Sequence, residues 1–325
     1  MTNNIYANAR AVTAMRNLLG YERLVRMAES ANAKDAFKIL SEVNFGDGTT
    51  SDASEYEALL AAEEQKLTSF IREVSPNEKL TRFLLAPKDY HNAQALMKAK
   101  FLKTDAAPML TEEGLYKTEL LKEKIFADDY DEFPSPMAEA LAKADVLFVS
   151  GEADGRKIDV LFKKALYRQL RELSDSDRLL GEIYRVKADA ANIATALRSR
   201  DFQEAKLQFV GGGRLGEDEL KILCGESVET IAEKFRYSPL KDLVFAATEG
   251  FSEGKPLSGF ERLADGYALA QLKKERYNDE GYRPFLLYCY YKTAELTNVR
   301  IVMSCLSNQI FGSDIKSRLR ETYEG

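Results

Sequence analysis

Helical periodicity dominates the chain. From Ile158 to Leu173, apolar residues recur at steps of three and four, which places them on one face of a helix. The polar stretch Ser174-Asp-Ser-Asp177 then breaks the pattern and offers helix N-caps, before a second apolar stripe runs from Leu179 to Leu197. Alternating apolar and polar residues, the mark of a half-buried strand, are essentially absent. The pattern predicts an all-α protein that contains a long helical hairpin.

The same hairpin can be traced in the first and last thirds of the chain. The predicted first arms, turns and returning arms are Tyr56–Val74, Ser75–Asn77 and Lys79–Phe101, and then Phe260–Arg276, Tyr277–Gly281 and Pro284–Leu306. Each first arm opens on an acidic residue: Glu57, Asp159 or Glu261. These acids follow one another at intervals of 102 residues (159 − 57 and 261 − 159). We therefore interpret the chain as one helical unit repeated three times, since a fixed long period is the signature of repeat architectures.

Each returning arm carries a short signature, an acid followed three residues later by asparagine. The signatures are Asp89 with Asn92, Asp189 with Asn192, and Glu295 with Asn298. The spacing places both side chains on one helix face. We favour a structural role, bonding to backbone inside each unit, because Asp and Asn otherwise weaken a long helix. The alternative is three equivalent functional contacts around a central axis.

Two further features divide the chain into repeats. A boundary is predicted near Lys103–Pro108 and another near Val210–Gly213, which gives helical domains at 1–105, 106–209 and 210–325. The second and third domains also share an opening pattern, because Leu115 and Leu215 are each followed by Glu-Leu at the same distance. The predicted architecture is thus an internal triplication.

Basic residues close each signature and are the candidate interface. Lys98 and Arg198 each follow the asparagine of their signature by six residues, and Arg300 follows Asn298 by two. Three such residues in pseudo-symmetric positions could line a basic rim or opening. The other interpretation, equally open from the sequence, is a solvated polar face.

Composition narrows the classes of function. The net charge is −6, whereas a nucleic-acid-binding protein favours a basic face, so no nucleic-acid partner is expected. The three cysteines are an odd number without CxxC spacing, and Cys289 and Cys305 lie in apolar stretches. Buried, reduced thiols and a cytoplasmic setting are therefore expected. We expect neither a signal peptide nor a bilayer-spanning segment.

Candidate chemistry is sparse. The single histidine, His91, has no counterpart in the other two signatures and cannot by itself assemble a zinc site. The run Gly211–Gly216 lacks the order of a phosphate-binding loop. The acidic run Asp128–Glu132 resembles magnesium-binding segments of some all-α enzymes, but no second acidic cluster faces it. We predict no catalytic residue, no cofactor and no metal.

The order and spacing of these segments resemble the C subunit of the bacterial and archaeal V-type (A-type) ATPases, the counterpart of the eukaryotic d subunit. The segments that carry the resemblance are Tyr6-Ala-Asn-Ala-Arg10 with Met15-Arg16, Asp89 through Lys98, Lys187-Ala-Asp189-Ala-Ala-Asn192 through Arg198, and Glu295 through Ile301. Together they span nearly the whole chain.

The resemblance implies three similar helical domains that form a funnel with a central opening. It implies a non-catalytic rotor part at the cytoplasmic face of the membrane, seated on the proteolipid rotor ring and receiving the central shaft. Torque would pass through it between ATP turnover and transport of H⁺ or Na⁺. Two other classes stay open: a soluble all-α repeat adaptor and a magnesium-dependent all-α enzyme that uses the Asp128 region.

Overall fold

The computed structural model describes residues 2–111, 114–252, 257–273 and 281–324, and within these ranges it contains helices and no strand. The all-α prediction is confirmed. The chain divides into two compact units, residues 1–77 with 239–325 and residues 78–238, which are described separately. In the described ranges no helix combines the length and apolar character needed to cross a membrane.

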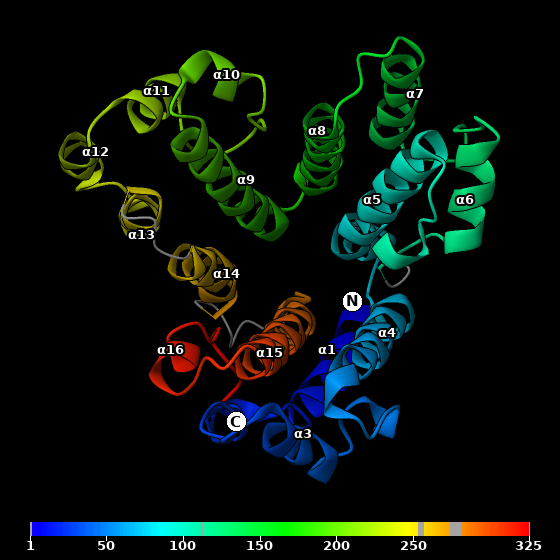
Figure 1. The fold of residues 1–325 in the computed structure, drawn as a ribbon, viewed down its shortest axis with the longest axis vertical. Coiled ribbons are helices and arrows are strands. Elements are labelled where there is room, and N and C mark those ends of the chain that lie inside the picture. Colours follow the sequence, from blue (N-terminus) through cyan, green and yellow to red (C-terminus); the bar gives the residue numbers. More distant parts are fainter. Residues whose placement is uncertain (1, 112–113, 253–256, 274–280, 325) are drawn as a thin grey trace. The chain divides into compact units, whose positions relative to one another are not determined.

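The first unit is built around one long helix, α15 (Figure 1). Six helices, α1, α2, α3, α4, α14 and α16, pack against it. Of its 25 residues, 17 are buried, so α15 is a core helix rather than an amphipathic surface helix. The helices of this unit are α1 (Thr2–Met15), α2 (Gly20–Ala28), α3 (Ala33–Glu42), α4 (Tyr56–Val74), α13 (Lys241–Ser252), α14 (Ser258–Lys273), α15 (Arg283–Ser307) and α16 (Ser313–Lys316), with short 3₁₀ turns at Phe45–Gly48 and Ala53–Glu55.

In the second unit α8 is the central element. It packs against α5, α7 and α9, and Figure 1 shows it between α9 and α7. Its fully buried Phe162 contributes about 1.5–3 kcal/mol of hydrophobic stabilisation. The helices of this unit are α5 (Glu78–Leu102), α6 (Thr118–Phe126), α7 (Ser135–Val149), α8 (Gly155–Ser174), α9 (Arg178–Ser199), α10 (Phe202–Lys206), α11 (Glu217–Gly225) and α12 (Val228–Phe235), with a 3₁₀ turn at Ala107–Met109.

The predicted hairpin arms correspond closely to helices. The second hairpin is α8 and α9, which pack together, and the Asp177 carboxylate caps α9 by accepting the N–H of Leu179 and Leu180. The third is α14 and α15; its predicted turn, Tyr277–Gly281, lies outside the described residues except at Gly281. The arms of the first are α4 and α5, which belong to different units. All three cysteines are free and buried, as expected for Cys289 and Cys305.

Candidate functional site

The six signature residues are all buried polar groups. Each is at most 3% exposed, and each lies on a returning arm, α5, α9 or α15. Burial of this kind is costly unless hydrogen bonds replace those lost to water. The residues are Asp89, Asn92, Asp189, Asn192, Glu295 and Asn298.

The three asparagines make the same double contact. Each side-chain oxygen accepts the N–H of one downstream residue, and each side-chain amide donates to the carbonyl of that same residue. The pairs, with the two distances in that order, are Asn92 with Thr111 (2.8 and 3.2 Å), Asn192 with Val210 (2.9 and 2.9 Å), and Asn298 with Arg320 (2.7 and 3.1 Å). The backbone that follows each returning arm is thereby fixed to it, with donor and acceptor both satisfied.

The Asp89 carboxylate holds the start of the next segment. The N–H of Leu115 donates to both carboxylate oxygens, at 2.8 and 2.9 Å, and the N–H of Tyr116 donates to Oδ1 at 3.1 Å. Hydrogen bonds to a charged acceptor contribute more than neutral ones. Asp89 therefore anchors the loop that leads into α6.

Asp189 has the corresponding role before α11. Its Oδ1 accepts the N–H of Arg214 at 2.7 Å and of Leu215 at 3.1 Å, whereas Oδ2 is buried with no hydrogen-bond partner among the described residues. Burial raises the pKa of Asp189, although the two backbone N–H groups oppose the shift. The shared opening pattern around Leu115 and Leu215 thus marks the residues whose N–H groups these acids bind.

Two glycines let the carboxylates approach the backbone. A Cβ atom on Gly114 would lie 2.6 Å from Cγ of Asp89, and one on Gly213 would lie 3.3 Å from Cγ of Asp189. The sequence pattern marks Gly213 only as part of a boundary and does not indicate Gly114. The available signal is a glycine 25 or 24 residues after the signature acid (114 − 89 and 213 − 189).

The third acid, Glu295, belongs to a buried ion network. Its Oε2 accepts the N–H of Leu19 at 2.5 Å, and its Oε1 accepts a hydrogen bond from Lys292 at 2.5 Å. Lys292 also pairs with Glu63 at 2.5 Å. Burial raises the pKa of Glu295. The pKa of Glu63 is lowered instead. Burial alone would raise it, but the Lys292 ammonium and the hydrogen bonds to the carboxylate outweigh burial.

The predicted interface residues have different partners. Lys98 on α5 pairs with Asp159 at 2.5 Å, and Arg300 on α15 pairs with Glu57 at 3.2 Å. Arg300 also reaches Glu64 on α4. Lys98 and Arg198 lie in one unit and Arg300 lies in the other. Two of the three first-arm acids are therefore partners of predicted interface residues.

Arg198 differs from the other two. It is exposed near the end of α9, and it has no carboxylate within ion-pairing distance in the described ranges. Burial and the nearby positive charge of Arg198 together lower the pKa of Lys163. The remaining first-arm acid, Glu261, pairs with Arg320 at 3.4 Å.

The other residues that the sequence raised for chemistry have ordinary partners. Nε2 of the exposed His91 lies 2.9 Å from the carbonyl oxygen of Met109. In the acidic run, Asp128 pairs with Lys100, while Asp129 and Glu132 pair with Lys124 at 2.6 and 2.7 Å. Among the described residues, no group of three or more His, Cys, Asp or Glu side chains is placed to hold a metal ion.

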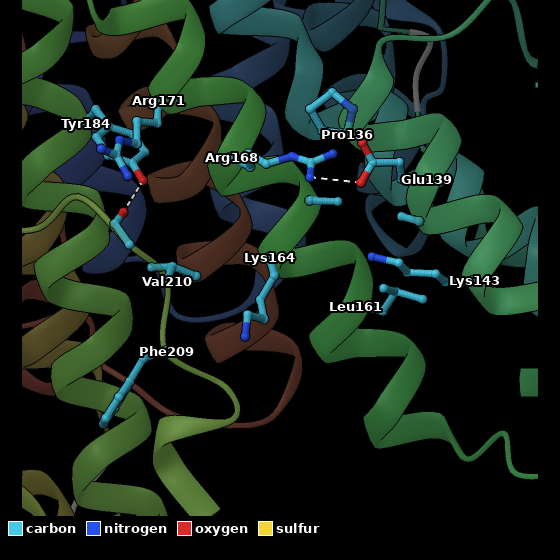
Figure 2. Close-up of a pocket in the computed structure, with 13 residues that line it drawn as sticks. Pro136, Glu139, Lys143, Leu161, Lys164, Arg168, Arg171, Tyr184, Phe209 and Val210 are labelled. Atoms are coloured by element: carbon cyan, nitrogen blue, oxygen red, sulfur yellow. Dashed lines mark hydrogen bonds and ion pairs between the residues drawn. The ribbon is translucent and has the colours of Figure 1, made fainter. Parts of the chain in front are cut away.

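A cavity of about 460 Å³ lies in the second unit, over one face of α8 (Figure 2). The wall on one side is α7, and the wall on the other is the segment 209–211 that follows α10. Figure 2 shows Arg168 and Glu139 reaching toward each other across the cavity, where they form an ion pair at 2.9 Å. The sequence patterns do not indicate this site, because its residues come from four segments, α7, α8, Tyr184 of α9 and 209–211, that only tertiary packing brings together.

Comparison with known proteins identifies relatives over most of the chain. The family described as ATP synthase (C/AC39) subunit matches residues 7–318. The chain is also similar to the C subunit of the V-type sodium ATPase of Enterococcus hirae, with 21% identity over 278 residues, 83% of each protein. The family match extends across both compact units and includes all three signatures.

Proposed function

The chain belongs to the ATP synthase (C/AC39) subunit family, and we propose that it is a non-catalytic connector in the central stalk of a V-type ATPase. In this role it is seated on the proteolipid rotor ring, at the cytoplasmic face of the membrane, and receives the central shaft. It transmits torque between ATP turnover and ion transport. Its partners in this role are proteins, and the role itself uses no catalytic residue and no cofactor.

The observation that carries the proposal is the order in which the signature acids bind backbone. We propose helical domains at 1–105, 106–209 and 210–325. In that division Asp89 binds Leu115 and Asp189 binds Leu215, each in the following domain. The acid of the last domain, Glu295, binds Leu19 in the first. This cyclic order supports three pseudo-symmetric domains around a central opening, an arrangement suited to a part placed on a rotation axis.

The same contacts suit a part under torsional load. Each signature acid joins a long helix to another domain through buried hydrogen bonds. Asn92 and Asn192 add a second link of this kind, at Thr111 and Val210. Asn298 binds Arg320 within its own domain. Buried hydrogen bonds of this kind hold one geometry, because breaking one of them leaves an unpaired buried group. Such links resist shear between consecutive domains.

Co-purification tests the proposed role directly. The tagged full-length chain is isolated from its native membranes in mild detergent, and its partners are identified by mass spectrometry. We expect a proteolipid ring together with shaft and ATPase head subunits. Recovery of soluble proteins alone would refute the central-stalk role and would leave the family membership unaffected.

The candidate interface can be tested by charge reversal. The triple variant Lys98→Glu, Arg198→Glu, Arg300→Glu is expected to keep its helical content, because exposed ion pairs contribute only about 0–1 kcal/mol each. Assembly with the rotor ring is expected to weaken and to become less dependent on salt. Circular dichroism and the yield of complex at two salt concentrations give the two readouts.

A matched control reverses three exposed lysines elsewhere. Lys34, Lys122 and Lys234 lie on α3, α6 and α12, and their replacement by glutamate changes the net charge by the same amount. We expect normal assembly from this control. Equal yields from the two triple variants would remove Lys98, Arg198 and Arg300 from the interface.

A further inference from the structure

The cavity over α8 follows one face of that helix for about three turns. Its floor comes from a single face of α8, between Leu161 and Arg171, where five residues at helical spacing line it. Ten residue steps of a helix span about 15 Å, or roughly three turns. Because α7 and the segment 209–211 stand on either side, the cavity is a groove with two walls (Figure 2).

The surface of the groove is mainly apolar. Ala165 from α8, Pro136 and Ala140 from α7, and Val210 from the opposite wall line it, and these side chains are otherwise buried in the protein. Phe209 adds a half-buried aromatic ring. Apolar surface of this kind is stabilised when apolar side chains of a partner cover it.

The polar lining is strongly basic. Lys143, Lys164, Arg168 and Arg171 face the groove, and Glu139 is its one acidic side chain. Glu139 is already paired with Arg168, so the lining carries an excess of three positive charges. This contrasts with the net charge of −6 for the whole chain. The groove is therefore a positively charged site that attracts negatively charged groups of a partner.

Two of these cations are available to a partner. The side chains of Lys143 and Arg171 are exposed, and the described residues place no carboxylate within ion-pairing distance of either. Lys164 donates to the carbonyl oxygen of Leu207 at 3.0 Å, which leaves two of its three ammonium protons for other acceptors.

We propose that this groove binds an acidic amphipathic helix of a partner protein. Its apolar face covers Ala140, Ala165 and Val210, and its carboxylates pair with Lys143 and Arg171. A single small anion fits less well, because Lys143 lies on α7 and the other cations are spread along about 10 Å of α8, from Lys164 to Arg171, instead of converging on one point. A lipid surface fits less well, because the apolar residues lie in a walled groove and do not protrude. This binding site does not depend on the central-stalk role.

Fluorescence anisotropy with designed peptides tests the proposal on the full-length chain. The probe is a labelled 18-residue peptide with leucine at i, i+3, i+4 and i+7 spacing and glutamate at most other positions. Two comparison peptides replace glutamate by lysine, or keep the composition and permute the leucines off a single face. We expect the acidic amphipathic peptide to bind at least about tenfold more tightly than either, with affinity that falls as salt rises.

Charge reversal within the chain locates the binding site. The variant Lys143→Glu, Arg171→Glu is expected to bind the acidic peptide about tenfold more weakly or worse. The control variant Lys122→Glu, Lys234→Glu carries the same change in net charge on α6 and α12 and is expected to bind normally. Circular dichroism of both variants excludes unfolding as the cause.

Four results would overturn the proposal. They are the absence of saturable binding, equal affinity for the acidic and lysine peptides, undiminished binding by the Lys143→Glu, Arg171→Glu variant, and equal binding of the permuted peptide. Two competition experiments separate the other ligands. Displacement of the peptide by millimolar inorganic phosphate would indicate a small-anion site, and sedimentation of the wild type but not the variant with anionic phospholipid vesicles would indicate a membrane site.

Discussion

Replacing Lys292 by methionine is expected to lower the free energy of unfolding by about 3–5 kcal/mol at neutral pH. Lys292 is 7% exposed and pairs with Glu63 and Glu295, both of which are also buried. Methionine has a similar length and no charge, so the variant keeps most of the packing. It leaves two carboxylates close together in the core without their common cation, and neither water nor another ammonium can fully replace it.

The loss of stability in this variant is expected to depend on pH. Its direction follows from the pKa values of Glu63 and Glu295. In the wild type, the Lys292 charge and hydrogen bonds lower the pKa of Glu63 despite its burial, so the stability that Glu63 contributes is lost as pH falls through its folded pKa. Burial raises the pKa of Glu295, so its protonated form is favoured by folding and that contribution is lost as pH rises. Without Lys292, burial should raise both pKa values. Acid then stabilises the folded state of the variant. The free energies of unfolding of the wild type and the variant should therefore converge as the pH falls from 7 toward about 5.

Two further variants separate charge from packing. Lys66 contacts the same Glu63 at 2.7 Å, but its side chain is 43% exposed, so Lys66→Met should lower stability by no more than about 1 kcal/mol. Adding Glu63→Gln and Glu295→Gln to Lys292→Met removes the uncompensated charges and keeps oxygen acceptors for the N–H groups of Gly46 and Leu19. We expect this triple variant to recover much of the loss in urea denaturation. A triple variant as unstable as Lys292→Met alone would show that the lysine acts through packing.

The long hairpin helices of this protein were predictable from local patterns. The apolar period and the polar stretch before α9 identified α8 and α9 to within a few residues, because both signals depend on neighbours along the chain. The acid and asparagine of each signature were also identifiable, since polar residues on the inner face of a long helix need partners. Their partners could not be predicted in the same way. The signature residues of α5 and α9 bind residues 18 to 27 positions further along the chain, and Glu295 binds a residue near its other end.

The groove and the ion network could not be predicted from the sequence, because both depend on contacts between distant segments. Lys143, Arg171 and Val210 are unremarkable positions in three separate segments, and their common feature is the cavity that the packing of α7 on α8 creates. Lys292 and Glu63 are 229 residues apart in the chain (292 − 63), and in sequence they read as ordinary surface charges. Periodicity specifies which face of a helix is inside and leaves open which charged residues meet there.

Substituting Gly114 by alanine is expected to destabilise the protein by about 2–4 kcal/mol. The added Cβ would lie 2.6 Å from Cγ and 2.8 Å from Oδ2 of Asp89. Asp89 is 1% exposed and its carboxylate accepts the N–H groups of Leu115 and Tyr116, so it cannot move away without losing these bonds. Urea denaturation measures the loss. Gly155→Ala is the matched control, because its Cβ meets nothing within 4 Å at the start of α8, and it should change stability by less than about 1 kcal/mol.

A double-mutant cycle shows whether the carboxylate is the cause. In an Asp89→Ala background the obstructing atoms are gone, so Gly114→Ala should then cost less than about 1 kcal/mol, and the two substitutions should be strongly non-additive. The pair Gly213 and Asp189 should behave alike, because a Cβ on Gly213 meets Asp189 in the same way. Additive effects would contradict the steric explanation. Matching coupling at both pairs would show that the repeats share a hydrogen-bonding scheme as well as a helical pattern.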